Sequence, residues 1–383
     1  MGLSATFRRV PKRVRSSISF GLKAVITVAG FYLLLTHRVD GGEGVGSIPI
    51  GQAILAYVDQ VDSTTFLMWS AIAMGVKFIG VISSAWGWHA LLRGQGLRFP
   101  FWTQVMTAFL IGRFIGTFLP STMGLDGYTL YEAGRYSNQW HRALTAKALE
   151  KFIGIAGLFT GLLLTLPAGY LVLEQVAGSA ALFGLSGATV LTLLIGGLSA
   201  GITGTVVVGL AWPWLIRLFM NLFGAFLPGP VRRHVERFRD AVTAYEGRFG
   251  LLLSVLLAKF ITHFTTAVVY YFTALAIGVV GVEFLPIVFG SLIQILGTLF
   301  SPTIAGEGAR EALQALLLSA HLGGAAQAVL SAALGFVAAE AATLWGGAFL
   351  WVRTPAWRPR FAEVDGVQVD YAWLDEEQVP EQG

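Results

Sequence analysis

The sequence predicts an all-α polytopic membrane protein with about six full spans and two re-entrant helical hairpins, arranged as an inverted-topology repeat. Hydrophobic residues form 55% of the 383 residues and charged residues 13%, with a mean hydropathy of +0.68, a composition typical of membrane proteins. Apolar runs long enough to cross a bilayer recur along the chain. Two further apolar stretches are each broken by proline and glycine beside an acidic residue.

The composition also excludes several classes of protein. The chain has no cysteine, which excludes disulfides, thiolate metal sites and thiol nucleophiles. It contains no nucleotide-binding loop motif, so we expect no ATP-driven transport by this chain alone. We expect no cofactor, no metal and no nucleic-acid partner.

Residues 1–65 are predicted to form an N-terminal signal-anchor span and an external loop. Basic residues precede the apolar run 20–36, which places the N-terminus in the cytoplasm. No convincing signal-peptide cleavage site follows this run, so we interpret it as retained. Residues 37–65 are acidic and are expected outside, where apolar residues at helical spacing predict a short surface helix over 50–61.

Residues 66–173 are predicted to form the first repeat. Residues 66–88 span inward and residues 152–173 span outward. Between them, residues 101–119 and 128–151 are interpreted as a hairpin entered from the cytoplasm, because many cations follow the break. These cations are Arg135, Arg142, Lys147 and Lys151, and most of them are interpreted as residues at the level of the lipid headgroups. Glu150 is interpreted as a marker of the membrane interface.

Residues 174–250 connect the two repeats. They are predicted to contain an inward span, 181–212, and a basic amphipathic helix, 231–249. The arginines of this helix suit the anionic lipids of the inner leaflet. Packing of the helix on the protein is the alternative.

Residues 251–352 are predicted to form the second repeat, in the opposite orientation. Residues 251–278 span outward, 284–300 and 309–320 form a hairpin entered from outside, and 325–352 span inward. Arginines then place the polar tail, 353–383, in the cytoplasm, where we expect it to be loosely ordered. The protein is therefore expected in the inner cell membrane with both termini cytoplasmic.

One broken-helix motif occurs in both hairpins. It reads GTFLPSTMGLDG from Gly116 and GTLFSPTIAGEG from Gly297. Lipid tolerates such backbone only inside protein or beside a wet cavity, and paired broken helices in inverted repeats mark substrate sites near the bilayer midplane. The helix-breaking residues are Pro120, Gly124 and Gly127 in the first copy, and Pro302, Gly306 and Gly308 in the second.

The charged residues at these breaks are the candidate substrate-binding residues: Arg113, Asp126, Glu307, Arg310 and Glu311. An unpaired charge at this depth is costly, so each acid is expected to hold a cation, a proton or an ion. The alternative for Asp126 and Glu307 is helix capping, and the alternative for Arg310 and Glu311 is a self-neutralising ion pair. In the functional interpretation, Arg310 and Arg113 grip a phosphate with their forked donors.

Four ionisable residues inside predicted spans are candidates for a proton or charge relay: Lys77, Lys259, His263 and Glu340. Such residues normally face the interior of a bundle and pair with one another. Glu340 could pair with Lys77 or with Lys259, and the sequence does not decide between them. His263 can exchange a proton near neutral pH, although a packing role is the more common one for a single histidine.

These motifs resemble the transmembrane region of lysylphosphatidylglycerol synthases. The resemblance rests on GTFLPSTMGLDGYTLYEAGR, ALEKFIG and SPTIAGEGAREAL, and covers roughly residues 66–352. The second motif of the family maps onto Pro302, Gly306, Gly308, Arg310 and Glu311. The first motif departs from the family pattern, because Gly124-Leu125-Asp126 stands where Gly-Gly-Asp is usual and Tyr128–Leu130 where an arginine is common.

The resemblance implies that the region moves phospholipid or lipid-linked headgroups between leaflets. The soluble aminoacyl-transfer domain of the synthases is absent, so aminoacyl-lipid synthesis is not implied. We therefore predict a flippase-like translocase, with a phospholipid or a polyprenyl-phosphate-linked lipid as partner. The alternatives are an intramembrane lipid-modifying enzyme and an accessory partner of a glycosyltransferase. The sequence leaves the lipid, the direction, the coupling ion and the oligomeric state open.

Overall fold

Long apolar helices form the body of the protein. The computed structural model describes residues 12–40, 47–118, 123–182, 184–223, 228–301, 303, 306–353, 357–359 and 361–371. Within these residues, five helices are long and apolar enough to cross a membrane, which confirms the predicted all-α polytopic class. They are α4 (Ser63–Gly94), α7 (Trp140–Ala177), α8 (Gly187–Ala211), α11 (Phe249–Ala276) and the run Ala325–Val352, which comprises α14 (Ala325–Leu344), the 3-10 turn Trp345–Ala348 and α15 (Phe349–Val352).

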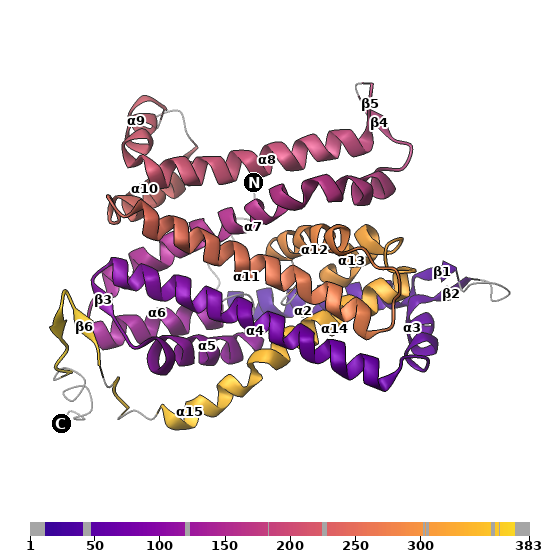
Figure 1. The fold of residues 1–383 in the computed structure, drawn as a ribbon, viewed down its shortest axis with the longest axis horizontal. Helices are drawn as coiled ribbons and strands as arrows, with labels where there is room; N and C mark the ends of the chain where they lie inside the picture. The colour runs from indigo at the N-terminus through magenta and orange to yellow at the C-terminus, as the bar shows by residue number, and fades with distance from the viewer. Residues whose placement is uncertain are drawn as a thin grey trace.

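The long helices run between two ends of the bundle, each marked by small elements (Figure 1). At what we call the β3 end, β3 (Leu97–Arg98), β6 (Glu363–Val364) and β7 (Val367–Gln368) form one sheet. At the α3 end lie β1 (Arg38–Asp40), β2 (Ser47–Pro49) and α3 (Ile50–Val58). A third small sheet, β4 (Ala181–Leu182) with β5 (Leu185–Ser186), joins α7 to α8.

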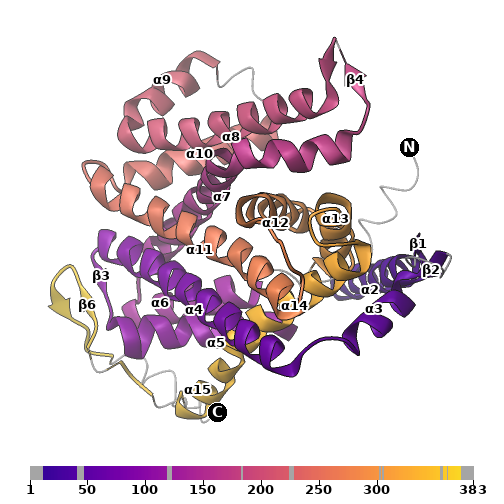
Figure 2. The same cartoon turned by 45° about the vertical axis from the view of Figure 1, so that its right-hand side comes forward.

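Two helical hairpins lie among the long helices. The first hairpin consists of the π-helical turn Phe101–Met106, α5 (Thr107–Phe118) and α6 (Met123–Ser137). The second consists of α12 (Phe284–Leu299) and α13 (Ala309–Leu318). The first lies in the half of the bundle next to the β3 end, and the second in the half next to the α3 end (Figures 1 and 2). At about 1.5 Å per residue, none of these four α-helices reaches the roughly 30 Å of a hydrocarbon core.

The first hairpin ends earlier than the sequence predicts. Instead of one arm over 128–151, α6 stops at Ser137 and α7 begins at Trp140. Asn138 turns the chain with φ of 53°, a left-handed conformation that asparagine tolerates better than most residues. The predicted return arm is therefore split. Its cationic second half belongs to the long helix α7.

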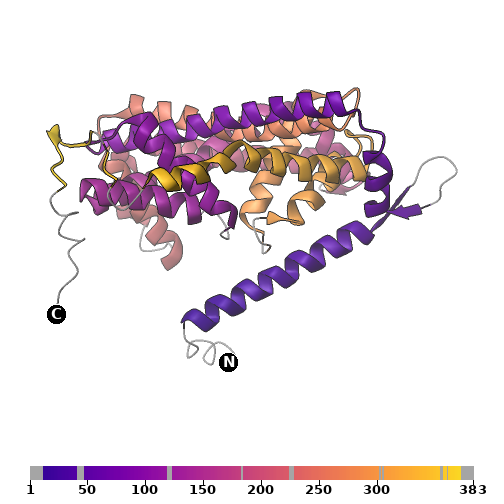
Figure 3. The same ribbon diagram turned by 90° about the horizontal axis from the view of Figure 1, so that it is seen from below.

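The N-terminal segment forms α2 (Lys12–Thr36), which contains the apolar stretch Val25–Thr36. The helix α2 covers the whole of the predicted span over 20–36. Figure 3 shows α2 running obliquely away from the rest of the bundle, from its attachment at the α3 end. The helix predicted over 50–61 is present as α3, which ends at Val58.

The connecting region contains α9 (Pro213–Phe223) and α10 (Gly229–Thr243) after α8. The predicted amphipathic helix corresponds to α10, although it ends before residue 249. Its apolar side chains Phe238 and Val242 are buried, and Phe238 contacts Phe152 of α7 with ring centroids 4.9 Å apart. This face of α10 therefore packs on the protein, while its arginines Arg232, Arg233 and Arg237 are exposed.

Part of the C-terminal tail is folded, in contrast to the prediction of a loosely ordered segment. Within residues 361–371, β6 and β7 form a hairpin whose first strand pairs with β3. Arg142 donates from Nη1 to both carboxylate oxygens of Asp365 at 2.8 Å. Ala362 is buried beside these strands. Residues 372–383 lie outside the described part of the chain.

Candidate functional site

The two arms of the first hairpin approach each other closely through glycine. A Cβ atom on Gly112 of α5 would lie 3.0 Å from Leu125 Cα, and one on Gly124 of α6 would overlap the backbone of Gly116. Contacts between backbones cannot relax as a side chain can, so only glycine allows this spacing. Gly124 and Gly127 lie inside α6 rather than at its break, and Pro120 lies outside the described residues.

Asp126 lies in the first turn of α6. Its carboxylate forms an ion pair with Lys151 and lies 3.9 Å from Lys147 Nζ. Both lysines belong to α7. The acid therefore joins the start of α6 to α7 as well as lying near the N-terminal dipole of its own helix.

Behind Asp126 lies a buried cluster of three charges, which we call the Glu150 triad: Lys147, Glu150 and Lys259. Glu150 accepts hydrogen bonds from Lys147 at 2.6 Å and from Lys259 at 2.5 Å. All three side chains are at most 8% exposed. Removing Glu150 would leave two buried ammonium groups without their shared counter-charge in a medium of low dielectric constant.

Neutral groups complete the Glu150 triad and connect it to other helices. Lys147 Nζ donates to Thr129 of α6 at 2.9 Å, and it lies 3.8 Å from the ring centroid of Trp88 of α4. Lys259 Nζ donates to Ser84 of α4 at 2.9 Å. The triad thus links α4, α6, α7 and α11. Lys147 and Glu150, which the sequence analysis interpreted as residues at the membrane interface, are both buried among these helices.

Arg113 of α5 reaches the last long helix. Its Nη2 lies 3.8 Å from Glu340 Oε1 of α14, and Thr117 donates to the other oxygen of Glu340 at 2.8 Å. Arg113 is therefore the partner of Glu340. Lys77 instead donates to Thr266 at 3.0 Å, and Lys259 belongs to the Glu150 triad.

The second hairpin carries a buried ion pair at the start of α13. Glu311 accepts from Arg310 at 2.5 Å and 3.0 Å through Oε1, and from the backbone N–H of Gly308 at 2.7 Å through Oε2. Glu311, rather than Glu307, thus stabilises the first turn of α13. The Arg310 guanidinium lies 4.2 Å from the ring centroid of Phe336 of α14.

Glu307 is the other acid of the second hairpin. It is half-buried, and within the described residues it has neither a hydrogen bond nor an ion pair. On either side of it, Gly306 and Gly308 adopt φ of 76° and 77°, backbone angles that favour glycine. Pro302 lies outside the described residues.

The middle of α14 brings the two hairpins together. Phe336 contacts Arg310 of the second hairpin, and Glu340, one helical turn later, pairs with Arg113 of the first. Four residues of helix rise about 6 Å, so the two arginines meet neighbouring turns of one helix. By contrast, Asp126 pairs with α7, and His263 on α11 lies one turn from Lys259.

A second link to the first hairpin was missed by the sequence analysis. Arg353, at the end of the α14–α15 run, forms an ion pair with Glu132 of α6 and donates to the carbonyl of Gln104 at 2.9 Å. Gln104 also donates to Glu132 at 2.8 Å. Arg353 was interpreted only as a cytoplasmic marker. Its contact with α6 depends on tertiary packing, which no local spacing in the sequence indicates.

Comparison with known proteins places these features in a family. Residues 50–347 match the family described as the lysylphosphatidylglycerol synthase TM region. The match includes both hairpins, the Glu150 triad and most of α14. No curated protein and no solved structure matches the chain.

Proposed function

We propose that this chain, which belongs to the family of lysylphosphatidylglycerol synthase transmembrane regions, translocates a phosphate-bearing lipid headgroup between leaflets. Membership supports a lipid-related function in the membrane. The finer statement, that the protein is a flippase-like transporter and not an enzyme, is our proposal. Its partner would be a phospholipid or a polyprenyl-phosphate-linked lipid.

The meeting of the two hairpins on α14 is the observation that carries the proposal. Each hairpin extends from a different end of the bundle, and Arg113 and Arg310 contact adjacent turns near the middle of the Ala325–Val352 run. An inverted pair of broken helices of this kind suits alternating access to a central site. A headgroup passing between the hairpins would meet both arginines at mid-depth.

Both arginines retain capacity to bind a phosphate. A guanidinium has five N–H donors, and Arg310 directs two nitrogens at Glu311. The 3.8 Å contact between Arg113 and Glu340 is longer than a hydrogen bond, so a phosphate oxygen would be a competitive partner. Gln314, one turn from Arg310, is fully buried with both amide atoms unpaired within the described residues, and a polar headgroup would satisfy them.

The orientation follows from charge. Arginines cluster at the β3 end, where Arg98 and Arg142 lie beside the folded tail and exposed arginines line α10. We assign this end to the cytoplasm by the positive-inside rule. Both termini would then be cytoplasmic in the inner membrane, and α10 would lie next to anionic lipids.

An intramembrane enzyme is the second candidate, because Ser84 lies 2.9 Å from Lys259 Nζ as a nucleophile lies near a base. However, the Lys259 ammonium donates to Glu150 as well as to Ser84, so it serves as a donor and not as a base. Among the described residues, no three histidine or acidic side chains form a metal-binding group. These contacts favour translocation. Analysis of lipid products after incubation with the purified protein would distinguish an enzyme.

Transport by variants of Arg310 tests the proposal. The protein is reconstituted into vesicles containing fluorescent phosphatidylglycerol, and outer-leaflet probe is quenched with dithionite. Loss of a charge-assisted contact worth about 1.5–3 kcal/mol predicts that Arg310→Gln slows translocation at least tenfold. Arg310→Lys, which keeps the charge beside Glu311, should also slow it because the forked donors are lost.

The matched control is Arg239→Gln, which removes a half-buried surface arginine paired with the exposed Asp240. It should leave the translocation rate within about twofold of the native value, because exposed pairs contribute little. Equal rates for the Arg310 and Arg239 variants would contradict a phosphate site at the second hairpin.

A further inference from the structure

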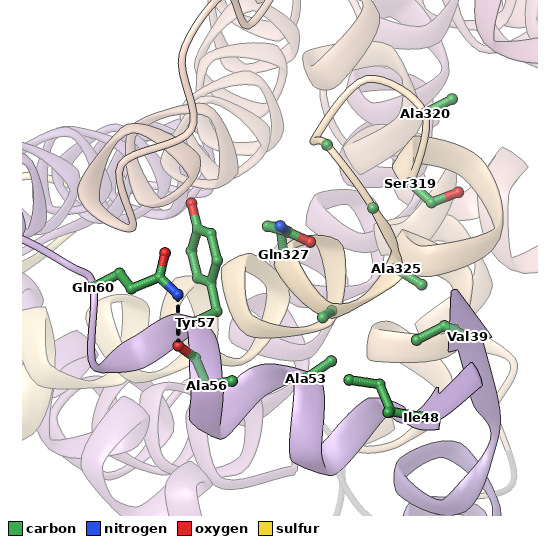
Figure 4. Close-up of a pocket in the computed structure, with 13 residues that line it drawn as sticks. Val39, Ile48, Ala53, Ala56, Tyr57, Gln60, Ser319, Ala320, Ala325 and Gln327 are labelled. Carbon is green, nitrogen blue, oxygen red and sulfur yellow. Dashed lines mark hydrogen bonds between the residues drawn. The ribbon is translucent and has the colours of Figure 1, made fainter. Parts of the chain in front are cut away.

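A cavity of about 730 Å³ lies at the α3 end of the bundle, away from the charged residues of the hairpins. Its walls are α3 with the β1–β2 hairpin on one side, and the loop from α13 to α14 with the first turn of α14 on the other (Figure 4). The volume is within the range of small-molecule sites. The occupant of this cavity would touch the base of the second hairpin, because Ser319 directly follows α13.

Four neutral polar side chains face the cavity: Tyr57, Gln60, Ser319 and Gln327. Gln60 donates from Nε2 to the carbonyl of Ala56 at 3.1 Å, which leaves its Oε1 as an acceptor. Within the described residues, the Tyr57 hydroxyl, the Ser319 hydroxyl and the Gln327 amide have no hydrogen-bond partner. Figure 4 shows Tyr57 on α3 and Gln327 on α14 among the residues that line the cavity.

The chemistry of this lining selects for an uncharged ligand. Among the residues that the structure describes, none that lines the cavity is charged. A phosphate or carboxylate there would lose water without gaining a counter-charge, which is costly. Burial raises the pKa of the Tyr57 phenol, so this group stays an O–H donor over the physiological range. Hydroxyls and amides both donate and accept, as the hydroxyls of a sugar do.

Apolar side chains supply the rest of the wall. Val39, Ile48, Ala53 and Ala325 line the cavity, and the Tyr57 ring offers an aromatic surface. Small residues along the α3 wall leave the room that a ring-shaped ligand needs. The combination of an aromatic surface, small apolar residues and neutral hydrogen-bonding groups suits the faces and edges of a pyranose.

We propose that this cavity binds an uncharged glycosyl group, as the polyhydroxylated part of a lipid headgroup at the α3 end. That a lipid carries this glycosyl group rests on the proposed function. That the cavity binds a glycosyl group does not. If a glycoside binds here and no lipid crosses the membrane, the cavity stands and the translocase proposal fails. If lipid crosses and no glycoside binds, the reverse holds.

The test measures glycoside binding by the full-length protein in phosphatidylcholine nanodiscs. Octyl β-glucoside, below its micellar concentration, is the probe, and saturation-transfer NMR is the readout. The native protein should bind it, and Tyr57→Phe and Gln327→Leu should each weaken binding about two- to tenfold, the effect of one lost neutral hydrogen bond. Octyl phosphate should bind more weakly than the glucoside.

A filling variant gives a matched comparison on one helix. Ala56→Trp places an indole into the cavity, whereas Leu55→Trp places it on the neighbouring exposed position, which does not line the cavity. Ala56→Trp should abolish glucoside binding, and Leu55→Trp should leave it unchanged. Absence of binding by the native protein, equal effects of the two tryptophans, or stronger binding of octyl phosphate would each overturn the proposal.

Discussion

Neutralising Glu150 is the perturbation that most directly tests the buried triad. Glu150→Gln keeps the size of the side chain and one acceptor but removes the negative charge between Lys147 and Lys259. The two ammonium groups donate to Glu150 from 2.6 Å and 2.5 Å, and both lysines are buried. After the substitution they would face each other across a neutral amide.

The expected loss of stability follows from this geometry. Removing one partner of a buried ion pair typically costs about 3–5 kcal/mol, because the remaining charge stays buried without compensation. We therefore expect Glu150→Gln to lower the free energy of unfolding by about that amount. The exposed pair between Arg232 and Glu236 in α10 provides the control, and Glu236→Gln should cost about 0–1 kcal/mol.

Unfolding by SDS in mixed micelles, followed by circular dichroism, measures both variants under the same conditions. A triple variant, Lys147→Met with Glu150→Leu and Lys259→Met, removes all three charges at once. It should recover most of the lost stability, because apolar groups of similar size often replace buried ion pairs without loss. A cost below about 1 kcal/mol for Glu150→Gln, equal to that of Glu236→Gln, would refute the triad as described.

Two further predictions concern the hairpins. Gly124→Ala should destabilise the protein by about 1–3 kcal/mol in the same unfolding assay, because its methyl would overlap the backbone of Gly116. Gly127→Ala should stabilise it by about 0.5–1 kcal/mol, because no described residue lies within 4 Å of the added methyl. Equal effects would contradict the close approach of α5 and α6. Single cysteines at the exposed positions His141 and Ala320, in a chain without native cysteine, should react with an impermeant maleimide from opposite faces of the membrane, and labelling of both from one face would contradict the opposed hairpins.

The spans and breaks were predictable because they depend on local composition. Long apolar runs identify α4, α7, α8, α11 and the Ala325–Val352 run without reference to tertiary structure. The breaks are visible because proline and glycine interrupt such runs. Gly306 and Gly308 show why, since both adopt backbone angles that other residues rarely adopt.

The charge pairing could not be read from the sequence, because it joins residues that are far apart in the chain. The i,i+3 spacing of Lys147 and Glu150 was available as a signal, but the position of the Asn138 turn decides whether this pair lies at the interface or inside the bundle. Lys259 reaches Glu150 only because α11 packs on α7. A positive-inside count treats all such cations alike.

The transbilayer movement of a lipid headgroup in vesicles tests the central claim most directly. The rate of transbilayer movement is measured for the native protein and for Asp126→Asn in vesicles that contain fluorescent phosphatidylglycerol. Protein-free vesicles give the baseline rate, and the two proteins are compared only if their thermal stabilities are equal. Asparagine keeps the size of aspartate and one acceptor oxygen but lacks the charge that pairs with Lys151 and Lys147. The account predicts rapid movement with the native protein and a rate near baseline with Asp126→Asn. Movement no faster with native protein than in protein-free vesicles would contradict it.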